Sequence, residues 1–361
     1  MAALTAPQPA PKATRASESL RLADLVAALS YALDLTGGQA AGWAVRSCLL
    51  GMRLADVLRL PACLRPHLYY ALLLKDTGCS SNATRVREIF EGDDLRAKRE
   101  SLLVDWERVS WSGWRVGMRV ARAGESWPRR LGRTLALGVA RRKHAREIIQ
   151  LRCERGAAIV ERMGFSDLTA EAIGALDERW DGRGAPRELR GAMIPILARV
   201  MRVAQAMALF PDSVTRALAT LAPGCGHIYD PTVVRAAREL RFERGLWADE
   251  RDEEVRRRVV EMDPGGVVAL DGPRLEEICE AFADVVDAKT PFTYQHSRGV
   301  AKAAVAMALG FGLPPGQVAL IRRAALLHDI GKLGVSNRIL EKPDKLSAED
   351  WQAVRLHPYY T

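Results

Sequence analysis

The sequence predicts an all-α protein, and two observations carry that prediction. Apolar residues recur every three or four positions between Leu22 and Leu33, and the same pattern returns between Leu275 and Val286. Nowhere does the chain show the alternation of apolar and polar residues that is typical of a half-buried strand. Glycine and proline at residues 37–38, 211, 263–266 and 310–316 mark the ends of the expected helices.

Length and composition predict more than one folded unit. The chain has 361 residues, with 48% hydrophobic and 27% charged, which suits two globular domains of about 100–200 residues each. The longest apolar stretches fall short of the roughly 20 residues that a membrane span needs. Residues 1–19 are rich in Ala and Pro and have no apolar centre of the kind found in secretory signals. We therefore expect a cytoplasmic protein with a disordered leader at 1–19, and reduced thiols at its six scattered cysteines.

The second half repeats the first half at a constant shift of 253 residues. The shift aligns Asp34 with Asp287 and Asp76 with Asp329, within helices of equal length and period. A charged stretch followed by an Asp-Pro-Gly-Gly turn at 263–266 favours a boundary between the copies. We expect a first helical domain at 20–248, a linker at 249–271 and a second, incomplete copy at 272–361.

Positive charge is concentrated in one segment. Between Arg96 and Arg155 there are 16 Lys and Arg against 6 Asp and Glu, and four Trp lie there as well. Basic and aromatic residues together are found in nucleic-acid-binding segments. The alternative, an insertion at about 96–143 that packs its Trp and solvates its Arg, is favoured because no nucleic-acid motif accompanies the charge.

One short segment of the second copy carries metal-binding chemistry. The apolar run Ala324–Leu327 leads into His328, Asp329 and, after Gly331, Lys332. An imidazole nitrogen and a carboxylate oxygen suit a divalent transition metal. If the helix persists through Gly331, Lys332 lies on the same face as His328 and reaches a phosphate at the metal.

Two more histidines stand at expected helix ends. His296 lies on a helix predicted to open with Thr290 as N-cap and Pro291 as its first residue, with Val300 and Met307 on its inner face. His357 follows a helix that Ser347 and Asp350 begin as a capping box. A His-Asp pair alone is most often a hydrogen-bonded core histidine, so the spacing of all three histidines has to carry the functional interpretation.

In order and spacing, His296-Ser297, residues 327–332 and His357-Pro358 resemble the HD-GYP family of bacterial metal-dependent phosphohydrolases. The resemblance implies a helical bundle with two or three metal ions and hydrolysis of cyclic di-GMP. It implies that His296, His328 and Asp329 bind metal, that His357 binds a second ion, and that Lys332 holds the phosphate, with Asp329 and Lys332 as catalytic residues. Phe292 stands where some members have a ligand Glu, which favours two ions, such as Fe or Mn.

The first copy resembles the same family but has lost its ligands. Residues 177–186 are similar to the family's His-His-Glu-Arg-Trp-Asp-Gly-x-Gly-Tyr-Pro signature, with Leu176 and Asp177 in place of the paired histidines. Trp43 replaces His296, Lys75 replaces His328 and Cys79 replaces Lys332. Either His144 or Arg152 matches His357, and Gly156 favours Arg152. Only Asp76 remains in this degenerate first site, and one carboxylate cannot hold two ions.

The second copy lacks the paired histidines and the Gly-Tyr-Pro loop of the family, so we expect a fragment of a longer protein or a partner chain that completes the site. The favoured function is a metal-dependent phosphodiesterase acting on cyclic di-GMP or another phosphate ester. The alternative is a non-catalytic regulator that senses a nucleotide or forms a homodimer. A third and weaker interpretation is nucleic-acid binding through the basic segment 96–155.

Overall fold

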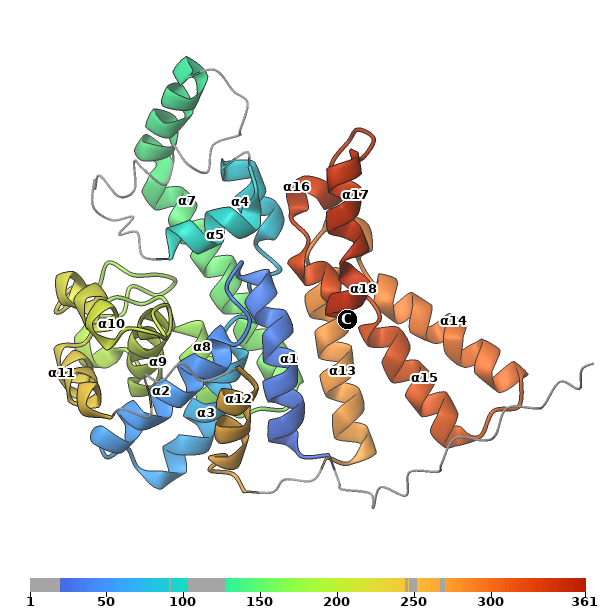
Figure 1. Cartoon of the computed structure of the whole chain (residues 1–361), viewed down its shortest axis with the longest axis horizontal. Helices are drawn as coiled ribbons and strands as arrows, with labels where there is room; N and C mark the ends of the chain where they lie inside the picture. The colour runs from blue at the N-terminus through green and yellow to red at the C-terminus, as the bar shows by residue number, and fades with distance from the viewer. Residues whose placement is uncertain (1–19, 91, 103–126, 244–245, 247–251, 267–269) are drawn as a thin grey trace, which may run out of the picture.

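A computed structural model of the chain is all-α (Figure 1). It describes residues 20–361 except 91, 103–126, 244–245, 247–251 and 267–269, and the described residues form no strand. The predicted leader at 1–19 and half of the predicted insertion, residues 103–126, lie outside the described residues. None of the described helices has an apolar run long enough to span a bilayer.

Eleven of the described α-helices precede residue 262 and six follow it. In chain order they are α1 (Leu22–Thr36), α2 (Trp43–Val57), α3 (Arg65–Leu74), α4 (Ala83–Phe90), α5 (Asp94–Ser101), α7 (Trp127–Arg162), α8 (Asp167–Gly174), α9 (Ile196–Met207), α10 (Val214–Leu221), α11 (Pro231–Glu239), α12 (Asp252–Glu261), α13 (Gly272–Asp287), α14 (His296–Gly310), α15 (Pro315–Leu327), α16 (Asn337–Leu340), α17 (Ala348–Arg355) and α18 (His357–Tyr360). Short 3₁₀ turns join several of them, including η6 (Pro291–Thr293) and η7 (Ile330–Gly334).

Helix boundaries confirm the tandem arrangement. Helices α2 and α14 begin 253 residues apart, at Trp43 and His296, and end 253 residues apart, at Val57 and Gly310. Helices α3 and α15 also end at this spacing. Helix ends keep a constant spacing when the same apolar pattern and the same helix-breaking residues recur in both copies.

The main apolar core runs through both halves of the chain. It includes Leu33 of α1, Leu73 of α3 and Phe282 of α13, together with Leu333 of η7. Turn η7 of the second copy contacts both α1 and α13, which lie near the centre of the molecule in Figure 1. The two copies therefore share buried surface rather than standing apart.

The segment 249–271, which we predicted to be a linker, contains helix α12. Val255 and Val259 of this helix are fully or almost fully buried in the main core, where α12 packs against α1 and α2. Their spacing of four residues puts both side chains on one face, which explains why a highly charged helix can pack inward.

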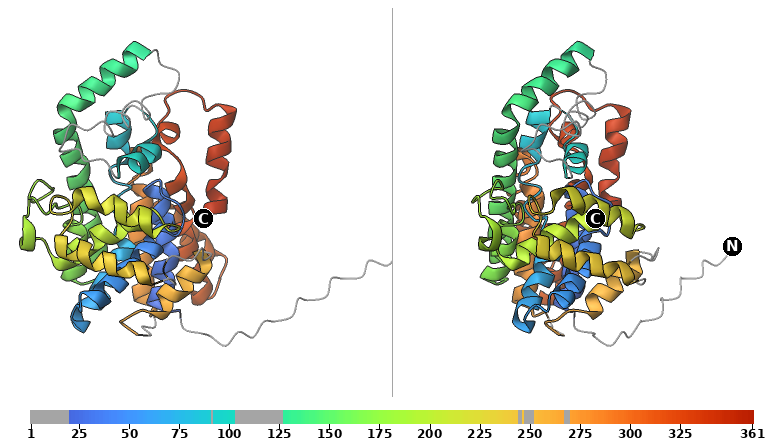
Figure 2. Two further views of the ribbon diagram at one scale, coloured as in Figure 1. Left: turned by 60° about the vertical axis from the view of Figure 1, so that its left-hand side comes forward. Right: turned by 90° about the vertical axis from the view of Figure 1, so that its left-hand side faces the viewer.

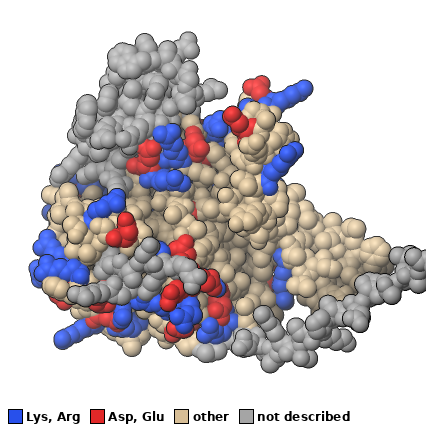
Figure 3. Space-filling model, in the orientation of Figure 1, with Lys and Arg blue, Asp and Glu red and all other residues tan. Residues whose placement is uncertain are grey.

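Two parts of the chain project from the bundle. Figure 2 shows the beginning of α7 extending past the other helices, and Figure 1 shows α14 and α15 forming an arm. The face of this arm visible in Figure 3 carries few charged side chains. Met307, predicted to lie on the inner face of α14, is instead 63% exposed, because α14 packs through Val300, Ala301 and Ala304.

Candidate metal centre

His328 and Asp329 lie in the turn between α15 and η7. Helix α15 ends at Leu327, so the predicted continuation of the helix through Gly331 is wrong. Lys332 instead reaches Asp329 through the 3₁₀ turn, where its Nζ lies 2.6 Å from Asp329 Oδ2. A 3₁₀ helix has three residues per turn, so the side chains of residues i and i+3 lie over one another, and Lys332 therefore lies beside Asp329.

His296 is the first residue of α14, not a residue of its second turn. The prediction that this helix opens at Pro291 is wrong, because Thr290 caps the separate turn η6 and Gln295 (φ 57°) then reverses the chain. Asp287, at the end of α13, accepts hydrogen bonds from the Ser297 backbone N–H (3.1 Å) and from Ser297 Oγ (2.7 Å). This carboxylate therefore fixes the start of α14 and the place of His296.

The structure brings His296, His328 and Asp329 together. One ligand atom of each lies within 4.8 Å of the other two, and among the described residues no other group of three His, Cys, Asp or Glu does so. Nε2 of His296 lies 3.4 Å from Asp329 Oδ2, and Nε2 of His328 lies 3.2 Å from the same oxygen. Nε2 of His357 lies 3.7 Å from Asp329 Oδ1, on the other side of the carboxylate.

Hydrogen bonds orient two of the imidazole rings. Nδ1 of His328 lies 2.8 Å from the carbonyl oxygen of Ala325, and Nδ1 of His357 lies 2.6 Å from that of Val354. A carbonyl oxygen can only accept, so Nδ1 carries the proton in each ring. Nε2 of each ring then faces Asp329. The tautomer with its proton on Nδ1 is the one that binds a metal ion through Nε2.

A glycine makes room for the last histidine. A Cβ atom on Gly331 would lie 2.0 Å from the carbonyl oxygen of His357, so a side chain there would push α18 away from η7. Thr361 Oγ1 fastens the contact by accepting a hydrogen bond from the Gly331 backbone N–H (3.1 Å). Close backbone approach thus positions His357.

The donor set fits a divalent transition metal. Asp329 is buried, with a side chain only 5% exposed, whereas the side chains of His296 and His328 are 43% and 37% exposed. A buried carboxylate flanked by open imidazoles can hold an ion on one side and leave the other side to substrate. Phe292, which stands where some related proteins have a ligand, is 79% exposed and offers no ligand atom.

In the first copy, basic side chains surround the carboxylate of Asp76. Lys75 Nζ forms an ion pair with Asp76 Oδ2 and lies 3.4 Å from the centre of the Trp43 ring. Arg152 lies 3.9 Å from Asp76 and forms an ion pair with Asp177, which Arg202 contacts as well. Burial alone would raise the pKa of Asp177, but these two guanidinium groups lower it below its usual value.

The structure identifies the counterpart of His357 in the first copy. A Cβ atom on Gly78 would lie 1.9 Å from the carbonyl oxygen of Arg152, just as one on Gly331 would meet that of His357. Arg152, rather than His144, therefore occupies the equivalent place. His144 lies about two helical turns earlier on α7.

Sequence reasoning missed the role of Asp287. The signal was present, since Asp34 and Asp287 are among the identities preserved at the 253-residue shift. Asp34 Oδ1 accepts a hydrogen bond from the Ala44 backbone N–H (2.9 Å), as Asp287 does from Ser297. The same cap thus starts the second helix of both copies.

Comparison with known proteins agrees with this all-α fold. HD-domain family models match residues 119–233 and 293–361. The 3'3'-cGAMP-specific phosphodiesterase 3 of Vibrio cholerae is 37% identical over 353 residues, which are 96% of this chain and 75% of that protein. The crystal structure of a cyclic GMP-AMP specific phosphodiesterase of V. cholerae is similar with a TM-score of 0.68 and 35% identity, covering 95% of this chain and 78% of that one.

A shorter match is found in a cyclic di-GMP phosphodiesterase of Pseudomonas aeruginosa, which is 43% identical over 67 residues, 19% of this chain and 16% of that protein. The helical fold and the His-Asp site define the class as an HD-domain phosphohydrolase. Given the similarity over nearly its whole length, the chain belongs to the HD-GYP type of this superfamily, and it is a metal-dependent phosphodiesterase with tandem HD modules.

Proposed function

We propose that this protein hydrolyses a phosphodiester bond of a cyclic dinucleotide at the site formed by His296, His328, Asp329, Lys332 and His357. The observation that carries the proposal is the convergence of three ligand atoms within 4.8 Å of one another. No comparable group is found around Asp76 in the described residues, so the second copy is the proposed working site.

In this proposal, Asp329 is the central ligand. Its Oδ2 faces His296 and His328, and its Oδ1 faces His357, so in this proposal the carboxylate would hold two ions together with these histidines. Bound divalent ions would supply an activated water at neutral pH and would stabilise negative charge on the phosphate oxygens. The number of ions and their identity, with two Fe or Mn as our expectation, are part of the proposal.

Lys332 supplies a positive charge beside the carboxylate. Its side chain is 27% exposed and pairs with Asp329 in the structure. An ammonium group with three N–H donors on a flexible stem can turn from the carboxylate to a substrate phosphate. We assign Lys332 to holding the phosphate and Asp329 to metal binding, and we regard both as catalytic.

The substrate preference rests on the relatives. The V. cholerae relative that matches over nearly the whole chain is named for 3'3'-cGAMP, whereas two relatives named for cyclic di-GMP match over 67 and 46 residues. We therefore propose 3'3'-cGAMP as the first substrate to test and cyclic di-GMP, which the sequence motifs alone favoured, as the second. Chromatography of the reaction products from equal concentrations of both compounds ranks them by kcat/KM.

The experiment that tests the site compares Asp329→Ala with Asp76→Asn. Asp329→Ala removes the shared ligand, so we expect bound metal to fall at least about 10-fold and hydrolysis to become undetectable. Asp76→Asn keeps the shape of its side chain, and we expect it to leave both within about two-fold. Metal content is measured by mass spectrometry of the purified protein.

Circular dichroism establishes that both variants are folded. Wild-type hydrolysis by Asp329→Ala, or loss of metal and activity in folded Asp76→Asn, would place the working site elsewhere. If Asp329→Ala loses metal but the wild-type protein hydrolyses neither dinucleotide, the metal centre is upheld and the proposed substrates are refuted.

A further inference from the structure

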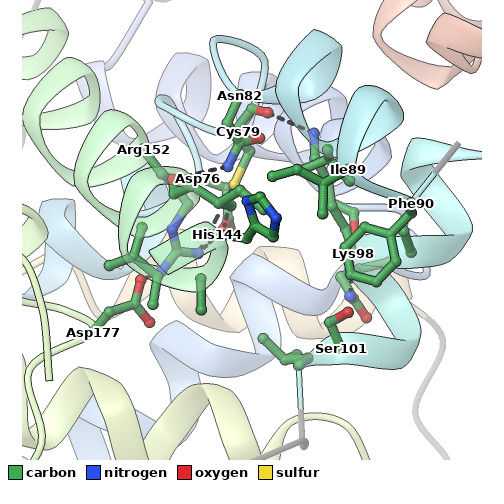
Figure 4. A pocket seen from close by; sticks show the side chains of 18 of the residues that line it. Asp76, Cys79, Asn82, Ile89, Phe90, Lys98, Ser101, His144, Arg152 and Asp177 are labelled. Carbon is green, nitrogen blue, oxygen red and sulfur yellow. Dashed lines mark hydrogen bonds and ion pairs between the residues drawn. The ribbon is translucent and has the colours of Figure 1, made fainter. Parts of the chain in front are cut away.

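The degenerate site of the first copy is a cavity rather than a filled core. It has a volume of about 170 Å³ and lies where the metal centre lies in the second copy, beside Asp76, Cys79 and Arg152. Helices α4, α5 and α7 form its walls (Figure 4). The proposed phosphodiesterase reaction does not use this cavity.

Its size limits what it can hold. An apolar cavity of about 150 Å³ accommodates benzene, and pockets for drug-sized ligands measure about 300–1,000 Å³. A cavity of about 170 Å³ therefore suits one ring or one short branched chain with a small substituent. A cyclic dinucleotide, with two bases, two sugars and two phosphates, is too large.

The lining combines apolar and charged side chains. Ile89 and Phe90 lie on one side together with Lys98 and Ser101, and Arg152 and Asp177 lie on the other (Figure 4). Ile148 adds to the apolar part of the wall. Such a site favours a ligand with an apolar body and a polar group at one end.

The charge of the lining favours an anion. Three basic side chains, Lys98, Arg152 and Arg202, line the cavity against the two carboxylates of Asp76 and Asp177. The pair formed by Asp76 and Lys75 adds no negative charge, and Asp177 is shared by two arginines. Lys98 is offset by the Asp94 carboxylate 3.9 Å away, so one positive charge is left over between Arg152, Arg202 and Asp177. Low dielectric strengthens its attraction for an anion.

Polar atoms also remain unused. The buried Nδ1 of His144 and Oγ of Ser101, which belong to lining residues, have no hydrogen-bond partner in the structure. A buried polar atom without a partner costs free energy, and a ligand with an acceptor or donor at its polar end would recover part of that cost.

We propose that the first copy binds a small monoanion with an aromatic or short branched apolar body, of which an aryl carboxylate is the simplest example. The carboxylate faces Arg152 and Arg202, and the ring packs against Ile89 and Ile148. The cavity wall includes α5, whose Lys98 Nζ lies 3.9 Å from Asp94, and Asp94 accepts hydrogen bonds from the start of α16 in the second copy. A bound ligand therefore contacts α5, the helix of the first copy that is hydrogen-bonded to α16 of the second copy.

The test uses 4-fluorobenzoate, followed by the ¹⁹F NMR line width, with the full chain. For a ligand of this size we expect a Kd of roughly 0.1–1 mM. 4-Fluorobenzyl alcohol and 4-fluorobenzylamine have the same ring without the negative charge, and we expect them to bind at least about 10-fold more weakly. These comparisons separate recognition of charge from partition into an apolar site.

Two variants locate the site. Ala145→Phe fills the cavity from α7 and should abolish binding, whereas Arg202→Gln should weaken fluorobenzoate at least about 10-fold while changing the alcohol less than about two-fold. Arg146→Gln is the matched control, because Arg146 is on the same helix as Ala145 but pairs with Glu188 outside the cavity. Thermal melts establish that each variant is folded.

Three results would overturn the proposal. The first is no line broadening at 5 mM ligand, which is about the concentration at which millimolar binding saturates. The second is equal affinity for the three fluorinated compounds. The third is wild-type affinity for 4-fluorobenzoate in folded Ala145→Phe. Competition by 3'3'-cGAMP in the absence of metal would contradict the size argument. Loss of phosphodiesterase activity has no bearing on the outcome, since binding is measured directly.

Discussion

At the scale of single residues, both copies neutralise one carboxylate with a lysine, but from different positions. In the second copy Lys332 follows Asp329 by three residues, and in the first copy Lys75 directly precedes Asp76. Lys75 thus stands where the second copy has His328, and its positive charge lies where a metal ligand would otherwise be. The substitution replaces a nitrogen donor by a cation, which repels a metal ion and stabilises the buried Asp76.

The buried Asp34 gives a testable dependence of stability on pH. Burial raises the pKa of Asp34 to about 8 from the usual 3.8, and Asp76 adds to the shift while Lys75 opposes it. The folded protein therefore keeps a proton that the unfolded chain releases between about pH 4 and pH 8, so this group lowers stability as pH rises through that window. Asp34→Asn cannot ionise and should remove the dependence.

Thermal melts of wild type and Asp34→Asn from pH 5 to pH 8.5 measure this effect. We expect the Tm of the variant relative to wild type to rise with pH by at least about 2–4 °C, which corresponds to about 1 kcal/mol or more for a domain of this size. The amide oxygen can still accept the hydrogen bond from Ala44. A Tm difference that is the same at pH 5 and pH 8 would show that Asp34 has an ordinary pKa.

At the scale of elements, two glycines allow one backbone to pass directly over another. The carbonyl oxygen of Arg152 would be 1.9 Å from a Cβ on Gly78, and that of His357 would be 2.0 Å from one on Gly331. Neither contact is with a flexible side chain, so an added methyl group must move a helix. The repeated close approach explains how two unrelated side chains, Arg152 and His357, reach equivalent places.

Gly331→Ala should therefore displace α18 and remove His357 from the metal centre. We expect Mn²⁺ binding to weaken about 10-fold or more, and stability to fall by about 1–3 kcal/mol from overpacking. Mn²⁺ affinity is measured by calorimetry and stability by urea denaturation. Gly334→Ala is the control, since its Cβ would meet only side-chain atoms of Leu35 and Tyr360, at ordinary distances of 3.5–3.7 Å. Unchanged Mn²⁺ affinity in Gly331→Ala would exclude His357 from the site.

At the scale of the whole molecule, a buried carboxylate joins the two copies. Asp94 of α5 accepts hydrogen bonds from Ser336 Oγ (2.9 Å) and from the Asn337 backbone N–H (2.7 Å) at the start of α16. Lys98 and Lys289 lie 3.9 Å and 4.0 Å from its other oxygen. Lys289 in turn donates a hydrogen bond to the carbonyl oxygen of Leu333 (2.9 Å), next to Lys332.

Asp94→Ala should destabilise the entire chain, because it leaves buried donors unsatisfied and removes the counter-charge of the buried Lys289 and the partly buried Lys98. Removal of one partner of a buried ion pair costs about 3–5 kcal/mol, so we expect Tm to fall by at least about 5 °C. Because the main core spans both copies, calorimetry should show one transition before and after the change. Asp212→Ala, at an exposed ion pair, should shift Tm by less than about 2 °C.

A Tm for Asp94→Ala within about 1 °C of wild type would mean that the polar contact contributes no net stability. Two separated calorimetric transitions in the wild type would mean that the copies unfold independently despite their common core. Either result would remove the structural link between the cavity and the metal centre.

Local sequence patterns were enough to predict the helical class, the tandem repeat and the metal-binding candidates. These properties depend on local spacing and on residue chemistry: apolar residues every three or four positions make helices, and imidazole and carboxylate groups suit metals wherever they meet. The ends of the helices were predicted less accurately from the sequence. Where Gln295 reverses the chain and where α15 gives way to a 3₁₀ turn, local patterns were compatible with a continued helix, and packing decided.

Contacts between residues far apart in the sequence could not be predicted, because they depend on the packing of the whole chain. Asp94 and Ser336 are 242 residues apart in sequence, and nothing local to either one indicates the other. The role of Asp287 and the cavity of the first copy likewise depend on how helices pack. Contacts of this kind are fixed by the burial of apolar faces over the whole chain, and polar partners are then chosen from whatever side chains that packing brings within hydrogen-bonding distance.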